Sequence, residues 1–272
     1  MVDTPLVALL HTAPPHPPLP AGGDAIVVDA LAKQYADGTD AVRGISFRVR
    51  AGEIFGILGP NGAGKSTTMG ILGTLVRPTG GTATVAGHDV VKQPRDVRRR
   101  IGFAMQAVGV DAFATGSELV RLAGRLHGLS RAEAARRTAL LLELFGLREA
   151  AHKRMAEYSG GMQRRVDLAS ALIHLPPVLF LDEPTEGLDP HARAGIWEAL
   201  ERLNDHLGTT VLLTTHYMEE ADRLCDRIAI VDGGRIVAEG TPAELKAAHA
   251  DELATLEDVY LETTGRALEV AA

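Results

Sequence analysis

Residues 54–69 constrain the fold of this 272-residue chain more than any other stretch. Residues 54–58 (IFGIL) form a short, mainly apolar run that is typical of a buried strand. The next eight residues, GPNGAGKS at 59–66, match the pattern G-x-x-x-x-G-K-[ST] in full. From residue 67 onward the apolar residues recur at helical spacing. The stretch therefore predicts a strand, a glycine-rich loop and a helix, in the order that a phosphate-binding loop requires.

The residue types in this loop suit the binding of a triphosphate. Glycines let the backbone curl around the β-phosphate and turn its N–H groups inward. The helix that follows presents its positive N-terminal end to the anion. Lys65 can reach the β- and γ-phosphates, and the hydroxyl of Ser66 can bind magnesium. The alternative is an ordinary glycine-rich turn, but average residue usage would match the four fixed positions in only about 1% of chains this long. We therefore predict nucleotide binding here, whereas this loop alone leaves the reaction undecided.

Composition narrows the class of protein. Hydrophobic residues make up 46% of the chain, which is ample for a core, and the net charge of −7 argues against binding nucleic acid by phosphate neutralisation. The single cysteine, Cys225, excludes a disulfide framework. Beyond the proline-rich residues 1–23, the longest run without Asp, Glu, Lys or Arg is residues 168–181, which contains two prolines and is too short to span a bilayer. We expect a cytoplasmic chain that is soluble on its own.

Sequence texture divides the chain into a tail, a two-part core, a helical insertion and a C-terminal extension. Six of the fourteen prolines precede residue 24, which predicts a disordered tail. The core segments carry short apolar runs that are typical of strands, whereas the insertion carries apolar residues at helical spacing behind a capping box at Ser130. The predicted boundaries are 1–23 for the tail, 24–106 and 165–241 for the core, 107–164 for the insertion and 242–272 for the helical extension.

Three further places in the sequence carry polar or aromatic residues of interest. An apolar strand ends in Asp182 and Glu183, which suggests one carboxylate for magnesium and one for a water molecule beside the phosphate loop. Ser159 precedes two glycines at the start of a helix, whose exposed N–H groups suit an anion, with an ordinary N-cap as the alternative. Tyr35 precedes a turn, where covering a strand end is favoured over stacking on an adenine ring.

Taken in chain order, these motifs resemble those of the ATP-binding cassette (ABC) ATPases, with matches from about residue 28 to residue 266. The resemblance implies an α/β fold: a P-loop (RecA-like) ATPase core with an antiparallel β subdomain and an inserted α-helical subdomain. It also implies hydrolysis of ATP with Mg²⁺ as cofactor. One departure is Glu186, where a small Ser or Thr is more usual. Residues 256–266 are similar to the C-terminal segment of drug- and antibiotic-export ATPases of the daunorubicin-resistance type.

The resemblance assigns the site residue by residue. Tyr35 matches the adenine-stacking aromatic, and the other ATP contacts fall to Gly59, Pro60, Asn61, Gly62, Ala63, Gly64, Lys65, Ser66 and Thr67. The resemblance implies that magnesium is held by Ser66, Gln106 and, through water, Asp182, and that Glu183, His216 and Lys65 take part in catalysis. The family signature, which would act on ATP bound by a partner chain, matches Ser159, Gly160, Gly161, Met162 and Gln163, with Tyr158 where Leu is commoner. The aspartate of the D-loop is Asp189.

The resemblance also implies partners. In this family the signature of one subunit closes the ATP site of another, so we expect a homodimer that holds two ATP molecules. Transport would need a separate membrane-spanning permease, docked between core and insertion near residues 106–118, which would hold the chain on the inner face of the cell membrane. We expect export of a drug-like or other hydrophobic compound, and no nucleic-acid partner.

Two alternatives stay open. A soluble ABC ATPase that does mechanical work on nucleic acid or ribosomes usually carries two cassettes or a long coiled coil between the motif halves, and the interval from Ser66 to Ser159 is too short for the coiled coil. A nucleotide-dependent regulator with weak turnover would have no need of Glu183 and His216. The residues favour an exporter subunit over both.

Overall fold

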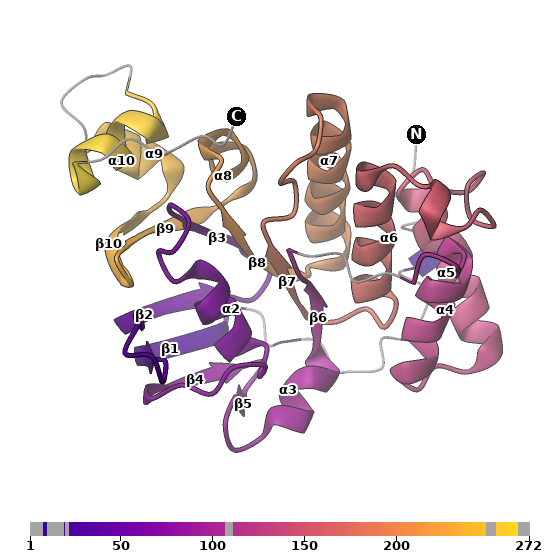
Figure 1. Ribbon diagram of the computed structural model, residues 1–272, viewed down its shortest axis with the longest axis horizontal. Coiled ribbons are helices and arrows are strands. Elements are labelled where there is room, and N and C mark those ends of the chain that lie inside the picture. The colour runs from indigo at the N-terminus through magenta and orange to yellow at the C-terminus, as the bar shows by residue number, and fades with distance from the viewer. Residues whose placement is uncertain (1–7, 10–18, 20–21, 107–110, 249–253, 266–272) are drawn as a thin grey trace.

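The structure, a computed structural model, describes residues 8–9, 19, 22–106, 111–248 and 254–265. Most of the predicted tail, residues 1–23, lies outside the described residues. Figure 1 shows a core with two sheets, a group of helices at one end of it, and two short helices near the C-terminus at the other end. The core is the part that positions the predicted site.

The larger sheet has six strands in the order β10-β9-β3-β8-β7-β6. Five of them are parallel, and β10 pairs antiparallel with β9 at one edge. The inner strands β3, β7 and β8 are buried along their whole length, which explains their continuous apolar runs. The bounds are β3 (Ile54–Leu58), β6 (Ile101–Ala104), β7 (Val178–Asp182), β8 (Thr210–Thr215), β9 (Arg227–Asp232) and β10 (Arg235–Gly240).

The smaller sheet is antiparallel throughout, in the order β2-β1-β4-β5. Its strands are β1 (Asp24–Gln34), β2 (Asp40–Arg50), β4 (Gly80–Val85) and β5 (His88–Asp89). The two sheets pack through apolar side chains, among them the rings of Phe47 on β2 and Phe55 on β3, which stack with their centroids 5.4 Å apart. This packing places the turn between β1 and β2, which begins at Tyr35, near the end of β3.

The helical group consists of α4 (Gly116–Leu126), α5 (Arg131–Leu144), a 3₁₀ turn η1 (Met155–Glu157) and α6 (Gly160–Leu172). Each α-helix has a hydroxyl cap: Thr115, Ser130 and Ser159 accept a hydrogen bond from the third backbone N–H that follows them. Figure 1 shows α4, α5 and α6 side by side at the end of the core opposite to the C-terminal helices. Helix α6 runs across the domain boundary predicted at 164/165 and continues towards the strand β7.

The remaining helices flank the sheets or follow them. They are α2 (Lys65–Leu72), α3 (Pro94–Arg100), α7 (Pro190–Leu207), α8 (Met218–Leu224), α9 (Pro242–Ala247) and α10 (Leu256–Thr264). The helical stretch predicted at 242–264 is thus described as two helices, with residues 249–253 outside the described residues. Over the part of the chain that the structure describes, no helix combines the length and the apolar character that crossing a bilayer requires.

Candidate ATP-binding and hydrolysis site

The predicted site lies where three neighbouring parallel strands end. In the sheet, β8 lies between β3 and β7, so the residues that follow Leu58, Asp182 and Thr215 emerge at the same edge. We call this the carboxyl edge. Ligands of open α/β sheets bind outside the carboxyl ends of the strands. The sheet order therefore explains how motifs far apart in sequence meet.

The phosphate loop connects β3 to α2 in a backbone path that needs glycine. Gly62 and Gly64 have φ angles of 81° and 98°, a region that side chains disfavour. A β-carbon on Gly64 would lie 2.2 Å from the carbonyl oxygen of Ala41, so this glycine also permits close packing against β2. No side chain caps the start of α2. The N-terminus of this helix therefore stays available for an anion, as the sequence predicts.

A cleft of about 410 Å³ lies over this loop. Most of the predicted ATP residues line it, together with three residues of the β1–β2 turn and the start of β2. Tyr35 lines it, with its hydroxyl 3.2 Å from that of Thr67 and the ammonium group of Lys33 5.0 Å from the centroid of its ring. The lining residues are Tyr35, Thr39, Asp40, Ala41, Asn61, Gly62, Gly64, Lys65, Ser66, Thr67, Gln106 and Glu183.

Three predicted loop residues, Gly59, Pro60 and Ala63, do not line the cleft but support the loop. The ammonium group of Lys65 donates to the carbonyl oxygens of Gly59 and Pro60, at 2.8 and 3.1 Å. Ala63 is buried in the core. Gly59 also packs against β9, because a β-carbon there would lie 2.2 Å from the carbonyl oxygen of Val231. These residues shape the loop and orient Lys65.

Asp182 and Ser66 meet at the carboxyl edge. The Ser66 hydroxyl donates to Asp182 Oδ1 at 3.2 Å, and the Thr214 hydroxyl donates to the same oxygen at 2.5 Å. A hydroxyl beside a carboxylate is a pair of oxygen ligands that suits Mg²⁺, so these residues fit the predicted metal. Sequence reasoning missed Thr214. The role of Thr214 follows from the pairing of β7 with β8, which places Asp182 opposite Thr214.

Glu183 is the centre of the site. Its backbone has a φ of 47°, unusual for a residue with a side chain, and its N–H donates to the carbonyl and hydroxyl oxygens of Thr214, both at 3.1 Å. Its carboxylate lies 3.1 Å from Lys65 Nζ and 3.5 Å from His216 Nδ1. It also accepts a hydrogen bond from Gln106 Nε2 at 3.1 Å. The structure therefore brings three of the other predicted metal and catalytic residues around the buried carboxylate of Glu183. They are Lys65, Gln106 and His216.

Glu186, the departure from the family pattern, lies beside this group. Gln106 Nε2 donates to Glu186 Oε2 at 2.7 Å. This hydrogen bond is the main reason that the pKa of Glu186 lies below its usual value. Glu186 is therefore ionised at neutral pH, and it brings a second carboxylate to Gln106.

The predicted signature lies elsewhere. Ser159 and Gly160 are exposed at the start of α6, and the Ser159 hydroxyl accepts a hydrogen bond from the N–H of Met162 at 3.3 Å. The Gln163 amide donates to the carbonyl oxygens of Met155 and Tyr158, within its own subdomain. None of the five signature residues lines the cleft. The N-terminus of α6 therefore lies outside the ATP cleft of its own chain.

The predicted D-loop residue Asp189 caps another helix. It accepts hydrogen bonds from the N–H groups of His191 and Ala192, both at 3.0 Å, at the start of α7. The hydrogen bond from Ala192 is the larger reason that the pKa of Asp189 is lowered. The start of α7 lies next to the signature, because a β-carbon on Gly161 would lie 3.1 Å from that of Ala192. Asp189, like the signature, is absent from the lining of the cleft.

Arg164 connects the signature helix to the carboxyl edge, and sequence reasoning did not single it out. Its buried guanidinium donates to the carbonyl oxygens of Asp182 at 2.9 Å and Pro184 at 3.0 Å, and to that of Met105. It also pairs with Asp167 at 3.1 Å. Burial raises the pKa of Asp167 to about 6, and the neighbouring Arg164 offsets only part of that rise. The sequence gives no signal for this role beyond the position of Arg164 in α6.

Comparison with known proteins agrees with this geometry. The family model described as ABC transporter matches residues 42–186. The daunorubicin/doxorubicin resistance ATP-binding protein DrrA of Streptomyces peucetius is 53% identical over 222 residues, which cover 82% of this chain and 67% of DrrA. A solved ATP-binding subunit of an ABC transporter superposes with a TM-score of 0.78 at 32% identity, covering 88% of this chain and 99% of that one.

A further solved structure is the dimeric ATP-binding cassette MJ0796 in a post-hydrolysis state bound to ADP and Pi. It superposes with a TM-score of 0.74 at 29% identity and covers 79% of this chain and 98% of that one. The chain therefore belongs to the ABC transporter family, as an ATP-binding subunit with ATPase activity. The predicted P-loop (RecA-like) ATPase fold and the resemblance to the daunorubicin-resistance type are confirmed, whereas the mechanical alternative gains no support.

Proposed function

We propose that two copies of this chain energise the export of a drug-like or other hydrophobic compound through a separate membrane permease. The relative DrrA, named for daunorubicin and doxorubicin resistance, supports the export of such compounds. The observation that carries the dimer is that Ser159 and Gly160, which begin the signature, are exposed, and that none of the signature residues lines the chain's own cleft. The dimeric cassette MJ0796 supports the same arrangement. Through the permease, the chain would lie on the inner face of the cell membrane.

In this proposal the residues of the carboxyl edge divide the work of hydrolysis. The phosphate oxygens of ATP would replace the Glu183 carboxylate as the partner of Lys65, since both compete for one ammonium group. Glu183 would then be free to orient the attacking water and accept its proton, a role worth about 10²–10⁴-fold in rate. His216 lies 3.5 Å from Glu183 and would hold the γ-phosphate. Tyr35 would stack on the adenine.

Magnesium is the proposed cofactor. Ser66, the side-chain oxygen of Gln106 and, through a water molecule, Asp182 would hold it, and its charge would neutralise that of the phosphates. The contact between Ser66 and Asp182 supports this assignment, because both ligands already share one place. Asp182 is held there by Thr214, so its carboxylate need not reorient. No partner-chain residue is needed for this part of the site.

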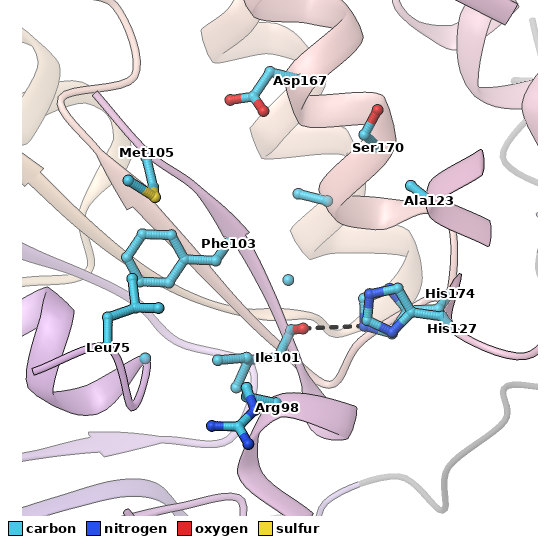
Figure 2. Close-up of a pocket in the computed structure, with 13 residues that line it drawn as sticks. Leu75, Arg98, Ile101, Phe103, Met105, Ala123, His127, Asp167, Ser170 and His174 are labelled. Atoms are coloured by element: carbon cyan, nitrogen blue, oxygen red, sulfur yellow. Dashed lines mark hydrogen bonds between the residues drawn. The ribbon is translucent and has the colours of Figure 1, made fainter. Parts of the chain in front are cut away.

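A second cavity, of about 390 Å³, offers a place for the permease (Figure 2). It lies between the core and the helical group. Leu75, Phe103 and Met105 form one side of it, and the stacked rings of His127 and His174, with centroids 3.6 Å apart, form the other. Leu75 and Met105 are exposed, as apolar side chains at a contact surface would be. We propose that a segment of the permease docks here, beside the predicted region 106–118.

The test of this proposal is purification with the permease in membrane vesicles, followed by measurement of ATPase rate and of ATP-dependent doxorubicin uptake into inside-out vesicles. We expect uptake that requires ATP and a rate that the transported compound changes. Absence of uptake for doxorubicin and for a panel of hydrophobic compounds would exclude drug export, without affecting the ATPase class.

Docking has its own test. Leu75→Glu places a charge on the apolar side of the second cavity and should weaken co-purification of the permease. Val237→Glu, at an exposed apolar residue on β10 that does not line this cavity, is the matched control. Equal effects of the two substitutions would place the docking surface elsewhere.

A further inference from the structure

We propose that Glu186 is a positioning residue that competes with magnesium for the side chain of Gln106. This inference rests on the proposed role of Gln106 as a magnesium ligand. It concerns a carboxylate on the exposed turn after β7 that accepts a hydrogen bond from Gln106 at 2.7 Å. Glu186 would thereby set how strongly magnesium enhances nucleotide binding.

The local fold directs Glu186 back towards the site. Its N–H donates to the carbonyl oxygen of Glu183 at 3.3 Å, which closes a tight turn after β7. The positive φ of Glu183 begins that turn. As a result, both carboxylates meet the same atom, Gln106 Nε2, which lies 3.1 Å from Glu183 Oε2 and 2.7 Å from Glu186 Oε2.

The chemistry of these partners fixes the orientation of the amide. Gln106 turns its NH₂ group towards both carboxylates, since its Nε2 donates to an oxygen of Glu183 and to one of Glu186. Magnesium binds oxygen, and it would therefore need the opposite end of the same amide. Gln106 must give up its hydrogen bond to Glu186 or reorient to become a ligand.

Glu186 competes more strongly than Glu183 for this amide. The hydrogen bond to Glu186 is the shorter of the two. Glu183 is also engaged by Lys65 at 3.1 Å and His216 at 3.5 Å, so its carboxylate is shared among several partners. Removing the Glu186 carboxylate should therefore release Gln106 for magnesium, while the Glu183 cluster stays in place.

The sign of the effect separates this inference from simpler roles of a negative charge. Competition for Gln106 predicts that loss of Glu186 increases the enhancement of nucleotide binding by Mg²⁺. Plain repulsion between Glu186 and phosphate predicts a decrease, because the metal-free nucleotide carries more negative charge and would benefit more from the loss. A Glu186 that itself helped to hold magnesium would also predict a decrease.

The experiment is calorimetry of the full chain with the hydrolysis-resistant analogue AMP-PNP, in excess Mg²⁺ and in EDTA. The ratio of the two dissociation constants is the Mg²⁺ enhancement. Glu186→Ala should raise this ratio about threefold to tenfold, the range for losing a partly exposed, charge-assisted hydrogen bond. Glu186→Gln should raise it less, because its amide oxygen still accepts a hydrogen bond from Gln106. Glu186 is exposed on a turn, so these variants should fold.

The Gln106→Ala background provides the decisive control. In that background Glu186→Ala should leave the enhancement unchanged, because no amide is left to compete for. An unchanged or lower ratio for Glu186→Ala alone would overturn the inference, and so would an equal rise in the Gln106→Ala background. If the unsubstituted chain shows no Mg²⁺ enhancement, the proposed magnesium site fails, and this inference with it. A normal enhancement that Glu186→Ala does not raise would overturn this inference alone.

Discussion

The carboxyl edge and the signature end of α6 are built in opposite ways. At the carboxyl edge, the side chains of Lys65 and Glu183 are each only 4% exposed, and they are paired with each other. At the signature end, Ser159 and Gly160 are exposed, and the Ser159 hydroxyl serves only the first turn of its own helix. The charged groups of the first region pair with each other within the chain, and the second region exposes the N-terminus of a helix. The difference is what the proposal of a signature that acts on ATP held by another copy requires.

Arg164 connects the two regions through hydrogen bonds. It belongs to the signature helix, yet it donates to the backbone of Asp182 and Pro184 at the carboxyl edge and to that of Met105 beside Gln106. The signature helix and the carboxyl edge are therefore in contact through a buried, charged side chain. The predictions below test each region and this connection, beginning with the largest expected effect.

Glu183→Gln should abolish catalysis at the carboxyl edge without preventing the binding of ATP. It preserves size and hydrogen bonding but removes the base, so we expect hydrolysis to fall about 10²–10⁴-fold. ATP should still bind, and a dimer held together by ATP should accumulate. Phosphate release and size-exclusion chromatography with ATP measure the two outcomes. Near-normal turnover would mean that another residue activates the water.

Arg164→Met should separate the two regions. It leaves several backbone carbonyl oxygens and Asp167 without their partner, so we expect the free energy of unfolding to fall by about 3 kcal/mol in denaturant titration. The matched control is Arg165→Met, because no described residue forms a hydrogen bond with that guanidinium, and it should cost less than about 1 kcal/mol. Equal losses for the two variants would show that Arg164 does not connect these regions.

Lys65→Ala should weaken the binding of ATP to the carboxyl edge. The substitution removes a charged donor to phosphate, which is worth about 1.5–3 kcal/mol, so affinity measured by calorimetry should fall at least about tenfold. Lys92→Ala is the control, since the side chain of Lys92 is 81% exposed and lies outside the cleft. Unchanged ATP affinity in Lys65→Ala would remove this residue from the site.

Tyr35→Ala should have the smallest effect. If the ring stacks on adenine, its loss should cost about 0.5–1.5 kcal/mol of binding free energy, whereas Tyr35→Phe keeps the ring and should cost little. Calorimetry with ATP distinguishes the two variants. Normal binding by Tyr35→Ala would leave the ring with the structural role that the sequence alone favours.

The sequence predicts what depends on neighbours along the chain. The strand, loop and helix at 54–72 are local, as are the hydroxyl caps at Ser130 and Ser159, and the structure has all of them. The carboxylate pair after β7 is likewise visible in the sequence, because an apolar strand ends there. In these places the backbone conformation and the helix caps depend on interactions between residues that are close together in the sequence.

What the sequence does not predict depends on contacts between distant segments. The role of Thr214 follows from the register of β7 with β8, which no local pattern contains. The role of Arg164 follows from burial of one helix face against the carboxyl edge. Gln163 matches the signature in sequence, yet its amide is used inside its own subdomain. The hydrogen bond of Gln106 to Glu186 also arises only once the turn after β7 meets the end of β6.

The central claim, that each ATP site is shared between two chains, is tested most directly by mixing two defective variants. Lys65→Ala damages the loop, and Ser159→Arg blocks the glycine-lined signature with a bulky side chain, so neither homodimer should occlude ATP. A mixed dimer has one doubly damaged site and one site with an intact loop and an intact signature. We predict that verified mixed dimers again trap ATP, measured as nucleotide retained after rapid gel filtration. Retention no higher than that of the two parent homodimers would contradict the shared site.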